Sequence, residues 1–239
     1  MRRKLIPLLV VSFVLLGAKP SLALTLSDTR TAIRRNVRDT ASSTSLRRYS
    51  DAVLLTFVNE SQRNIINETW ASSDSTSTTV SAGTIYYSLP TEAIKVWRVT
   101  LGGANLVELD LTQLDADNYD SSWGTSGTPT SFFTTRSRRT EIGLQPYPST
   151  SGGSLIIYYF QMVPDLSSDS DVPFDSDYRL YSYHDLIVFY VSARILLSEN
   201  RITEAEAYLK LYSAGLQTMA LNVGHKPQRN IATAKEVKP

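Results

Sequence analysis

The period of the hydrophobic pattern changes twice along the chain, and this change constrains the fold more than any single motif. Apolar residues repeat at helical spacing in residues 24–71 and again in residues 173–221. Between them, residues 72–172 carry short β-branched and aromatic runs separated by Gly, Pro, Ser and Thr. We therefore expect an α+β protein in which N- and C-terminal helical pairs form a four-helix bundle with an inserted antiparallel β module.

The helical segments carry start and stop signals. The spacing predicts a first helix from Ser27 to Asp39, and Ser50 is a suitable N-cap for a second. A third helical pattern follows Asp175, with a centre that is apolar on every side and should be deeply buried. Thr203 and Glu206 have the spacing of a capping box for the last helix.

The middle of the chain reads as strands and turns. We predict strands at 84–87, 94–100 and 154–160. Gly102-Gly103 is typical of a hairpin turn. Residues 71–79, rich in Ser and Thr, suggest a polar break, and residues 111–119 suggest one or two helical turns.

The N-terminal segment, residues 1–23, resembles a secretory signal peptide. Three basic residues precede an apolar run from Leu5 to Ala18, and small residues follow at Ser21 and Ala23. The run is too short to span a membrane comfortably. Two alternatives stay open: an apolar helix that is retained, or a start codon assigned upstream of the true one.

The C-terminal segment, residues 222–239, is polar, basic and without hydrophobic period. Such a segment cannot bury enough apolar surface to offset its ordering entropy, so we expect a flexible tail that orders on a partner. The predicted docking residues of this tail are Lys226, Arg229, Lys235 and Lys238.

The sequence carries no pattern that indicates catalysis. It has no cysteine, which excludes disulfides and thiolate metal sites, and it lacks the common nucleotide, hydrolase and metalloprotease motifs. His184 and Asp185 are adjacent on a helix, so their side chains diverge. The acidic loop from Asp169 to Asp177 lacks the Gly and Glu of a calcium loop and suits a helix start better. We expect no enzyme activity, no cofactor and no metal site.

Basic and aromatic clusters are the remaining candidates for a functional surface. The arginines predicted to face a partner protein or DNA phosphates are Arg30, Arg34, Arg38, Arg136, Arg138 and Arg139. The first three recur every four residues, so they should share one helix face, and protein docking is the favoured role. A solvated charged face is the alternative. Tyr86, Tyr87 and Trp97 are predicted at a subunit interface, where aromatic residues are enriched.

Several weak motifs occur together in one order. Tyr49-Ser50-Asp51 is followed by Phe57-Val58-Asn59-Glu60-Ser61-Gln62. Later segments are Gly83 to Pro90, Gly127 to Phe132, Ile142 to Pro148, Leu155 to Tyr159 and Leu166 to Pro173. In this order the chain, over residues 26–220, resembles the head-to-tail adaptor (connector) proteins of tailed bacteriophages.

The resemblance implies a four-helix core with a β insertion and no enzyme activity. It also implies a homo-oligomeric ring, usually of twelve copies, docked under the portal protein with a tail or nozzle protein below. Genomic DNA would pass through its lumen without sequence specificity, at the head–tail junction of a virion assembled in the host cytoplasm. A signal peptide departs from this pattern. It leaves the alternative of an exported periplasmic or cell-surface binding module without enzyme activity.

Overall fold

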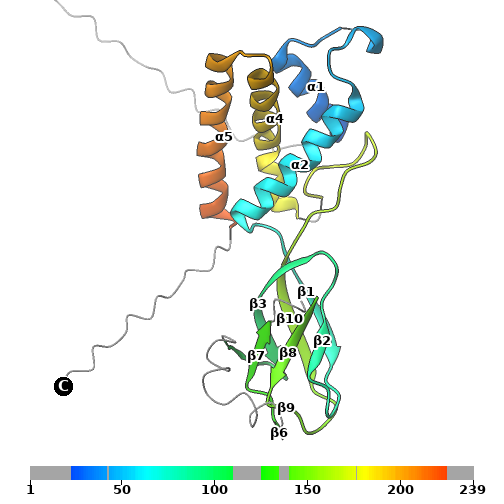
Figure 1. Ribbon diagram of the computed structural model, residues 1–239, viewed down its shortest axis with the longest axis vertical. Coiled ribbons are helices and arrows are strands. Elements are labelled where there is room, and N and C mark those ends of the chain that lie inside the picture. Colours follow the sequence, from blue (N-terminus) through cyan, green and yellow to red (C-terminus); the bar gives the residue numbers. More distant parts are fainter. Residues whose placement is uncertain (1–22, 42, 110–124, 135–139, 176, 225–239) are drawn as a thin grey trace, which may run out of the picture.

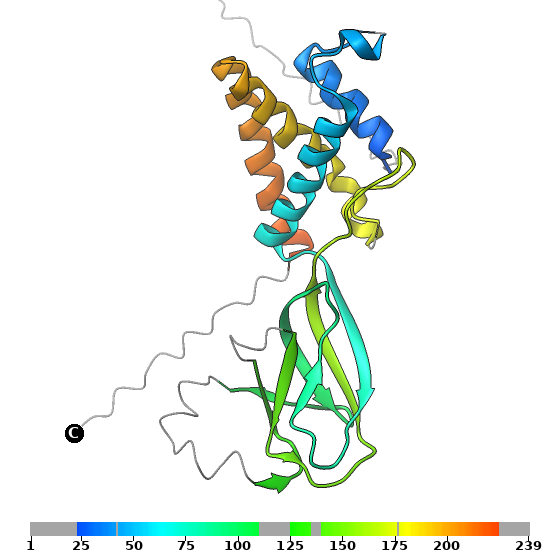
Figure 2. The ribbon, with the colours of Figure 1, turned by 45° about the vertical axis from the view of Figure 1, so that its right-hand side comes forward.

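The computed structural model describes residues 23–41, 43–109, 125–134, 140–175 and 177–224, which form two parts lying end to end (Figure 1). One end consists of helices from both the start and the end of the chain, and we call it the helical part. The other end is built from strands of the middle of the chain, and we call it the β module. Figure 2 shows the same separation from a second side. The molecule is therefore α+β and elongated.

The helical part contains four α-helices within the described residues. They are α1 (Leu26–Val37), α2 (Asp51–Thr69), α4 (His184–Ser198) and α5 (Ile202–Asn222). Two short 3₁₀ helices, η1 (Thr44–Leu46) and η2 (Tyr178–Tyr183), precede α2 and α4. Ser50 caps α2 as predicted, since its side chain accepts a hydrogen bond from the Val53 N–H. Thr25 and Asp28 form a capping box at the start of α1.

The four helices enclose one apolar core. α4 packs against each of the other three, which explains why its centre is apolar all round. Ile187 and Val191 of α4 are fully buried, as are Ile33 of α1 and Val58 of α2. This deep burial confirms the expectation for the third helical pattern.

The β module packs two four-stranded sheets face to face. The first has the strand order β1 (Ser73–Thr79), β10 (Ser154–Gln161), β3 (Ala93–Leu101) and β4 (Ala104–Asn105). The second has the order β2 (Tyr86–Ser88), β8 (Glu141–Gln145), β7 (Ser131–Thr134) and β5 (Val107–Glu108). A third pair joins β6 (Ser126–Gly127) to β9 (Tyr147–Pro148). Side chains from both large sheets, such as Val99 and Leu144, form a second apolar core.

Most strand pairs are antiparallel, as predicted, with two exceptions. β5 pairs with β7, and β6 with β9, in parallel over two residues each. The predicted turn at Gly102-Gly103 joins β3 to β4, and both glycines have positive φ.

Residues 71–79 were expected to form a polar break, but most of them form strand β1. Every residue of β1 pairs with β10, so backbone hydrogen bonds hold the strand although its side chains are mostly Ser and Thr. β1 lies at the edge of its sheet, where polar side chains cost little because much of the strand faces solvent. Polarity alone therefore misled the prediction.

The predicted capping box of Thr203 and Glu206 is absent. α5 begins at Ile202, so Thr203 already has helical backbone and cannot serve as its N-cap. The cap position is occupied by Arg201, which makes no side-chain cap bond. Its guanidinium instead pairs with Glu204, in the first turn of the helix.

The two parts are joined by close packing at the end of α2. Trp70 ends the helix in the left-handed conformation, and its ring meets Phe160 of β10 edge-on, with 4.9 Å between centroids. On the return path, Asn59 of α2 donates to the Leu166 carbonyl at 3.0 Å and accepts from the Leu166 N–H at 2.9 Å. Gln62, one turn later, donates to the Pro164 carbonyl at 2.8 Å. The entry to and exit from the β module are thus both fixed to α2.

Several predicted features lie outside the described residues. These are residues 1–22 of the N-terminal segment, the helical turns at 111–119, Arg136, Arg138, Arg139, and the tail from residue 225, including Lys226, Arg229, Lys235 and Lys238. Among the helices that the structure does describe, none is both long enough and apolar enough to cross a membrane.

Candidate interaction site

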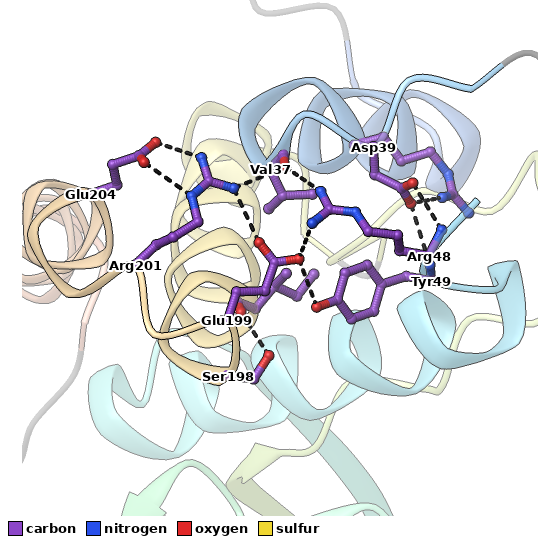
Figure 3. A network of polar contacts seen from close by, with 10 residues as sticks. Val37, Asp39, Arg48, Tyr49, Ser198, Glu199, Arg201 and Glu204 are labelled. Carbon is purple, nitrogen blue, oxygen red and sulfur yellow. Dashed lines mark hydrogen bonds and ion pairs between the residues drawn. The ribbon is translucent and has the colours of Figure 1, made fainter. Parts of the chain in front are cut away.

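A network of arginines and carboxylates closes the end of the helical part that lies farthest from the β module (Figures 1 and 3). It joins the end of α1, the start of α2, the end of α4 and the start of α5. We call it the arginine–carboxylate network. Its members are Arg34, Arg38, Asp39, Arg48, Tyr49, Asp51, Glu199, Arg201 and Glu204.

One half of the network is buried around Arg34. Its guanidinium donates to Asp39 and to Asp51, each at 2.7 Å. Asp39 also accepts from the backbone N–H groups of Arg48, at 2.9 Å, and Tyr49, at 3.3 Å. Arg34 and Asp39 are both buried, so ion pairs and hydrogen bonds within the protein replace the contacts that their charges would make with water.

The other half is centred on Glu199, which follows α4. Its carboxylate accepts from Tyr49 at 3.0 Å, from Arg201 at 3.1 Å, and from Arg48. Arg201 in turn makes a two-pronged contact with Glu204, at 2.9 and 2.6 Å. The same residues are seen converging in Figure 3. The loop between α4 and α5 is therefore tied to the start of α2.

The network also satisfies a carbonyl at the end of α1. The Val37 carbonyl accepts from Arg48 at 2.7 Å and from Arg201 at 3.2 Å. The last carbonyls of a helix have no partner within the helix, and cations are favourable beside them. Arg38 has the left-handed conformation that ends α1, with φ of 62°.

Three carboxylates of the network have lowered pKa values. The hydrogen bond from Arg34 lowers the pKa of Asp51 below its ordinary value. Burial alone would raise the pKa of Glu199, but hydrogen bonds from Arg201 and Tyr49 and the charge of Arg48 outweigh it and lower this pKa. The hydrogen bond from Arg201 likewise lowers the pKa of Glu204. These three carboxylates therefore stay ionised to lower pH than free carboxylates do.

The three arginines predicted to form one exposed stripe are separated by the structure. Arg30 is largely covered and pairs with Asp169. Arg34 is buried in the network, whereas the Arg38 side chain is 77% exposed and lies 3.6 Å from Glu204. The three arginines therefore do not form the shared surface that was expected. Helical spacing places residues on one face of a helix, but it does not show which of them other segments of the chain will cover. Arg35, next to Arg34, is exposed and has no charged partner within the described residues.

The three aromatic residues predicted at a subunit interface also differ from one another. Tyr87 is buried in the core of the β module, and its hydroxyl accepts from the Ser81 N–H at 3.1 Å. Tyr86 is half-buried and meets Phe133 edge-on. Trp97 is partly exposed and stacks at a tilt against Tyr158, with 5.6 Å between centroids. Trp97 is therefore the most exposed of the three.

His184 is structural, as expected. It is buried, and its two ring nitrogens contact the Leu24 N–H at 3.0 Å and the Pro173 carbonyl at 2.7 Å. Since a carbonyl can only accept, Nε2 carries the proton and Nδ1 accepts, which defines a neutral imidazole. Burial lowers the pKa of His184. The ring ties the approach to α1 to the start of α4.

The acidic loop before α4 also has a structural role. Asp171 accepts from the N–H groups of Ser167 and Ser168, which lowers its pKa. Asp177 caps η2 through the Arg179 N–H. The described residues contain no group of three or more His, Cys, Asp or Glu side chains able to hold a metal ion.

Asn59 and Gln62 have roles that the sequence alone did not predict. Both are buried on α2, and they bind the backbone of the segment that leaves the β module (residues 164–166). A polar residue repeated on a helix face that is otherwise apolar is the signal that could have identified them. The motif around Asn59 is thus accounted for by the attachment of the β module.

The family model of the SU10 adaptor protein matches residues 24–234, which include both parts. The chain belongs to this family of phage head-to-tail adaptors, as the resemblance indicated. It is accordingly a structural protein of the virion. A search of curated proteins finds no match.

Proposed function

We propose that the protein forms a ring that joins the portal to the tail and lets DNA pass. The observation that carries this proposal is the family match, which runs through the helices and the β module without a break. A protein that closes a ring needs two different surfaces, each complementary to the other on the next copy. Both parts of the molecule offer exposed surface for such contacts and for further partners.

Docking to the portal would use the basic surface near the arginine–carboxylate network. Arg38 is exposed there, and its guanidinium is only loosely held by Glu204. Arg34 contributes indirectly, because it fixes the start of α2. The basic tail from residue 225 would order on the same partner.

Passage of DNA requires contacts that are individually weak and independent of sequence. Arginine contacts to phosphates have this character and weaken as salt rises. Arg136, Arg138 and Arg139, which lie between β7 and β8 in the sequence, are the arginines we propose for the lumen. Twelve copies would place many such weak contacts around the duplex.

The proposal is tested by native mass measurement of residues 24–239, alone and mixed with the portal protein of the same phage. We expect a cyclic homo-oligomer, or its appearance on mixing. A chain that remains monomeric in both samples would contradict the proposal. The variant Arg38→Gln should weaken attachment to the portal, whereas Arg63→Gln, on α2 and paired with Asp165 at 2.9 Å, is the matched control.

A second function is favoured by residues 1–23, which resemble a signal peptide. If they are cleaved, the protein is exported and acts as a periplasmic or cell-surface binding module. N-terminal sequencing of the protein from the producing cell decides between the two. A mature chain that starts at Leu24 would favour export, and a retained N-terminus would favour assembly in the cytoplasm.

A further inference from the structure

The outer face of α5 carries an apolar stripe that nothing in the described chain covers. It consists of Ala207, Leu211, Ala214, Thr218 and Leu221, which recur at intervals of four and three residues. All five are exposed, and Leu211 and Leu221 are 52% and 86% exposed. The hydroxyl of Thr218 is turned to the Ala214 carbonyl, so even this polar side chain adds little polarity to the stripe.

The stripe faces away from the core. The buried positions of α5 are Ala205, Tyr212 and Met219, which follow one another at intervals of seven residues. On a helix with 3.6 residues per turn, the stripe lies roughly 140° from them. Apolar residues at intervals of four and three are the pattern by which helices pack against other helices. The pattern on this face is therefore that of a helix–helix contact that still needs its partner.

A second exposed surface lies on the opposite edge of the helical part. α4 lies between α1 and α5, and Figures 1 and 2 both place α5 on one side and α1 with η1 on the other. Next to this other edge, η1 carries Leu46, which is 73% exposed, and the first turn of α2, which follows η1 in the chain, carries Val53, which is 40% exposed. Arg35 of α1 adds a cation without a charged partner within the described residues.

The two edges also differ in charge. The stretch 26–50 contains six arginines and two aspartates, whereas α5 contains two glutamates and one lysine. Much of the arginine charge is paired inside the chain. Within the described residues, Arg35 on one edge has no charged partner, and neither do Glu206 and Lys210 on α5, of which Glu206 can oppose Arg35. Opposite charges on facing surfaces favour one orientation and speed association.

From these observations we infer that the α5 stripe of one copy packs against the α1–η1–α2 edge of the next copy. This inference rests on the proposed ring and names its interface. Because the two surfaces differ and lie on opposite edges, each copy keeps one free surface after pairing, so the contact repeats from copy to copy. A pairing of α5 with itself would instead stop at a dimer.

The test uses two variants, each damaged on one edge only. Leu211→Glu puts a charge in the middle of the α5 stripe, and Arg35→Glu with Val53→Glu reverses the charge and polarity of the other edge. All three positions are exposed, so the fold should persist, which far-ultraviolet circular dichroism can check. Gln217→Glu adds the same charge to an exposed α5 position outside the stripe and is the matched control.

We expect each damaged variant alone to lose the ring, with self-association weakened tenfold or more, and Gln217→Glu to keep it. An equimolar mixture of the two damaged variants should form a one-to-one dimer, because each still has one intact surface. Rings formed by Leu211→Glu alone would overturn the inference and leave the proposed function standing. So would a dimer formed by Arg35→Glu/Val53→Glu alone, since it would show α5 pairing with itself. No ring from the unaltered chain, even with portal, would overturn both.

A cysteine cross-link gives an independent measurement. The chain has no cysteine, so introduced thiols react without background. The double variant Leu211→Cys with Val53→Cys should give a ladder of covalent oligomers on mild oxidation, whereas each single variant can give at most a dimer. A double variant that stops at the dimer would overturn the head-to-tail arrangement.

Discussion

In the helical part, charged side chains reach across to the backbone and carboxylates of neighbouring helices, whereas in the β module apolar side chains fill the space between two sheets. Among the described residues, the buried side chains that are charged or titrate near neutral pH are Arg34, Asp39 and His184, and all three belong to the helical part. In the β module, the described core consists of residues such as Phe132, Ile142 and Leu155. The helical part should therefore respond to charge and pH, and the β module to side-chain volume.

The largest expected effect is the loss of the buried cation. Arg34→Ala leaves Asp39 buried without its cation and frees Asp51 from its closest partner. Removing one member of a buried ion pair costs about 3 kcal/mol or more, and we expect a loss of this size in the free energy of unfolding. Chemical denaturation measures it. Arg35→Ala, at the neighbouring exposed position, should change stability by less than about 0.5 kcal/mol. Equal losses for the two variants would show that the buried half of the network is not stabilising.

The next effect concerns volume in the β module. A Cβ added at Gly143 would lie 2.0 Å from the Phe133 ring, so Gly143→Ala forces an aromatic ring out of its place. Overpacking of this kind costs about 1–3 kcal/mol. In the matched variant Gly215→Ala, the added Cβ would lie 2.3 Å from a terminal methyl of Leu186, which can shift more easily than a ring, and the alanine gains helix propensity, so the cost should be smaller.

Hydrogen exchange shows where the damage falls. Gly143→Ala should raise exchange in β7 and β8 while α4 stays protected, because the two cores are separate. Uniform loss of protection in both parts would mean that they unfold as one unit, which would contradict the view that the two cores are stabilised separately.

A smaller effect is expected from pH, and it should be confined to the helical part. Burial lowers the pKa of His184, so the folded state binds fewer protons than the unfolded state. Stability is then complete above the unfolded pKa of about 6.5 and declines as pH falls from there towards the lower folded pKa. The carboxylates Asp51, Glu199 and Glu204 have lowered pKa values, so their contribution is lost only below roughly pH 4.

Denaturation at a series of pH values separates these two windows. His184→Gln should flatten the decline just below pH 6.5 and leave the acidic decline in place. If the stability of this variant declines equally just below pH 6.5, a group other than His184 causes the decline in that pH range.

The sequence predicted the helices well and the polar contacts poorly. The apolar period of α2 and α4 and the cap at Ser50 are local signals, and the structure confirms them. The burial of Arg34 depends on Asp51, which lies 17 residues away, and the attachment of Asn59 depends on Leu166, which lies 107 residues away. No local pattern reports such partners. The same holds for β1, whose strand character comes from β10 and not from its own Ser and Thr residues.

The last prediction concerns β1, an edge strand of the β module whose outer side has no neighbouring strand in its sheet. The far end of the helical part, by contrast, is closed by the arginine–carboxylate network. The Val80 N–H donates to the Gly153 carbonyl at 2.9 Å, so the even-numbered residues of β1 make the ladder bonds to β10. The odd-numbered residues, including Ser77, then direct their backbone groups away from the sheet. Ser77→Pro removes only an outward N–H and should cost less than about 1 kcal/mol. Thr76→Pro removes a ladder bond and leaves an acceptor of β10 unpaired, which should cost about 1–3 kcal/mol more. Thermal unfolding of the two variants measures the difference. If the edge pairs with a strand from another chain, Ser77→Pro should also weaken assembly. Unchanged assembly would show that the edge of β1 faces solvent and makes no such pairing.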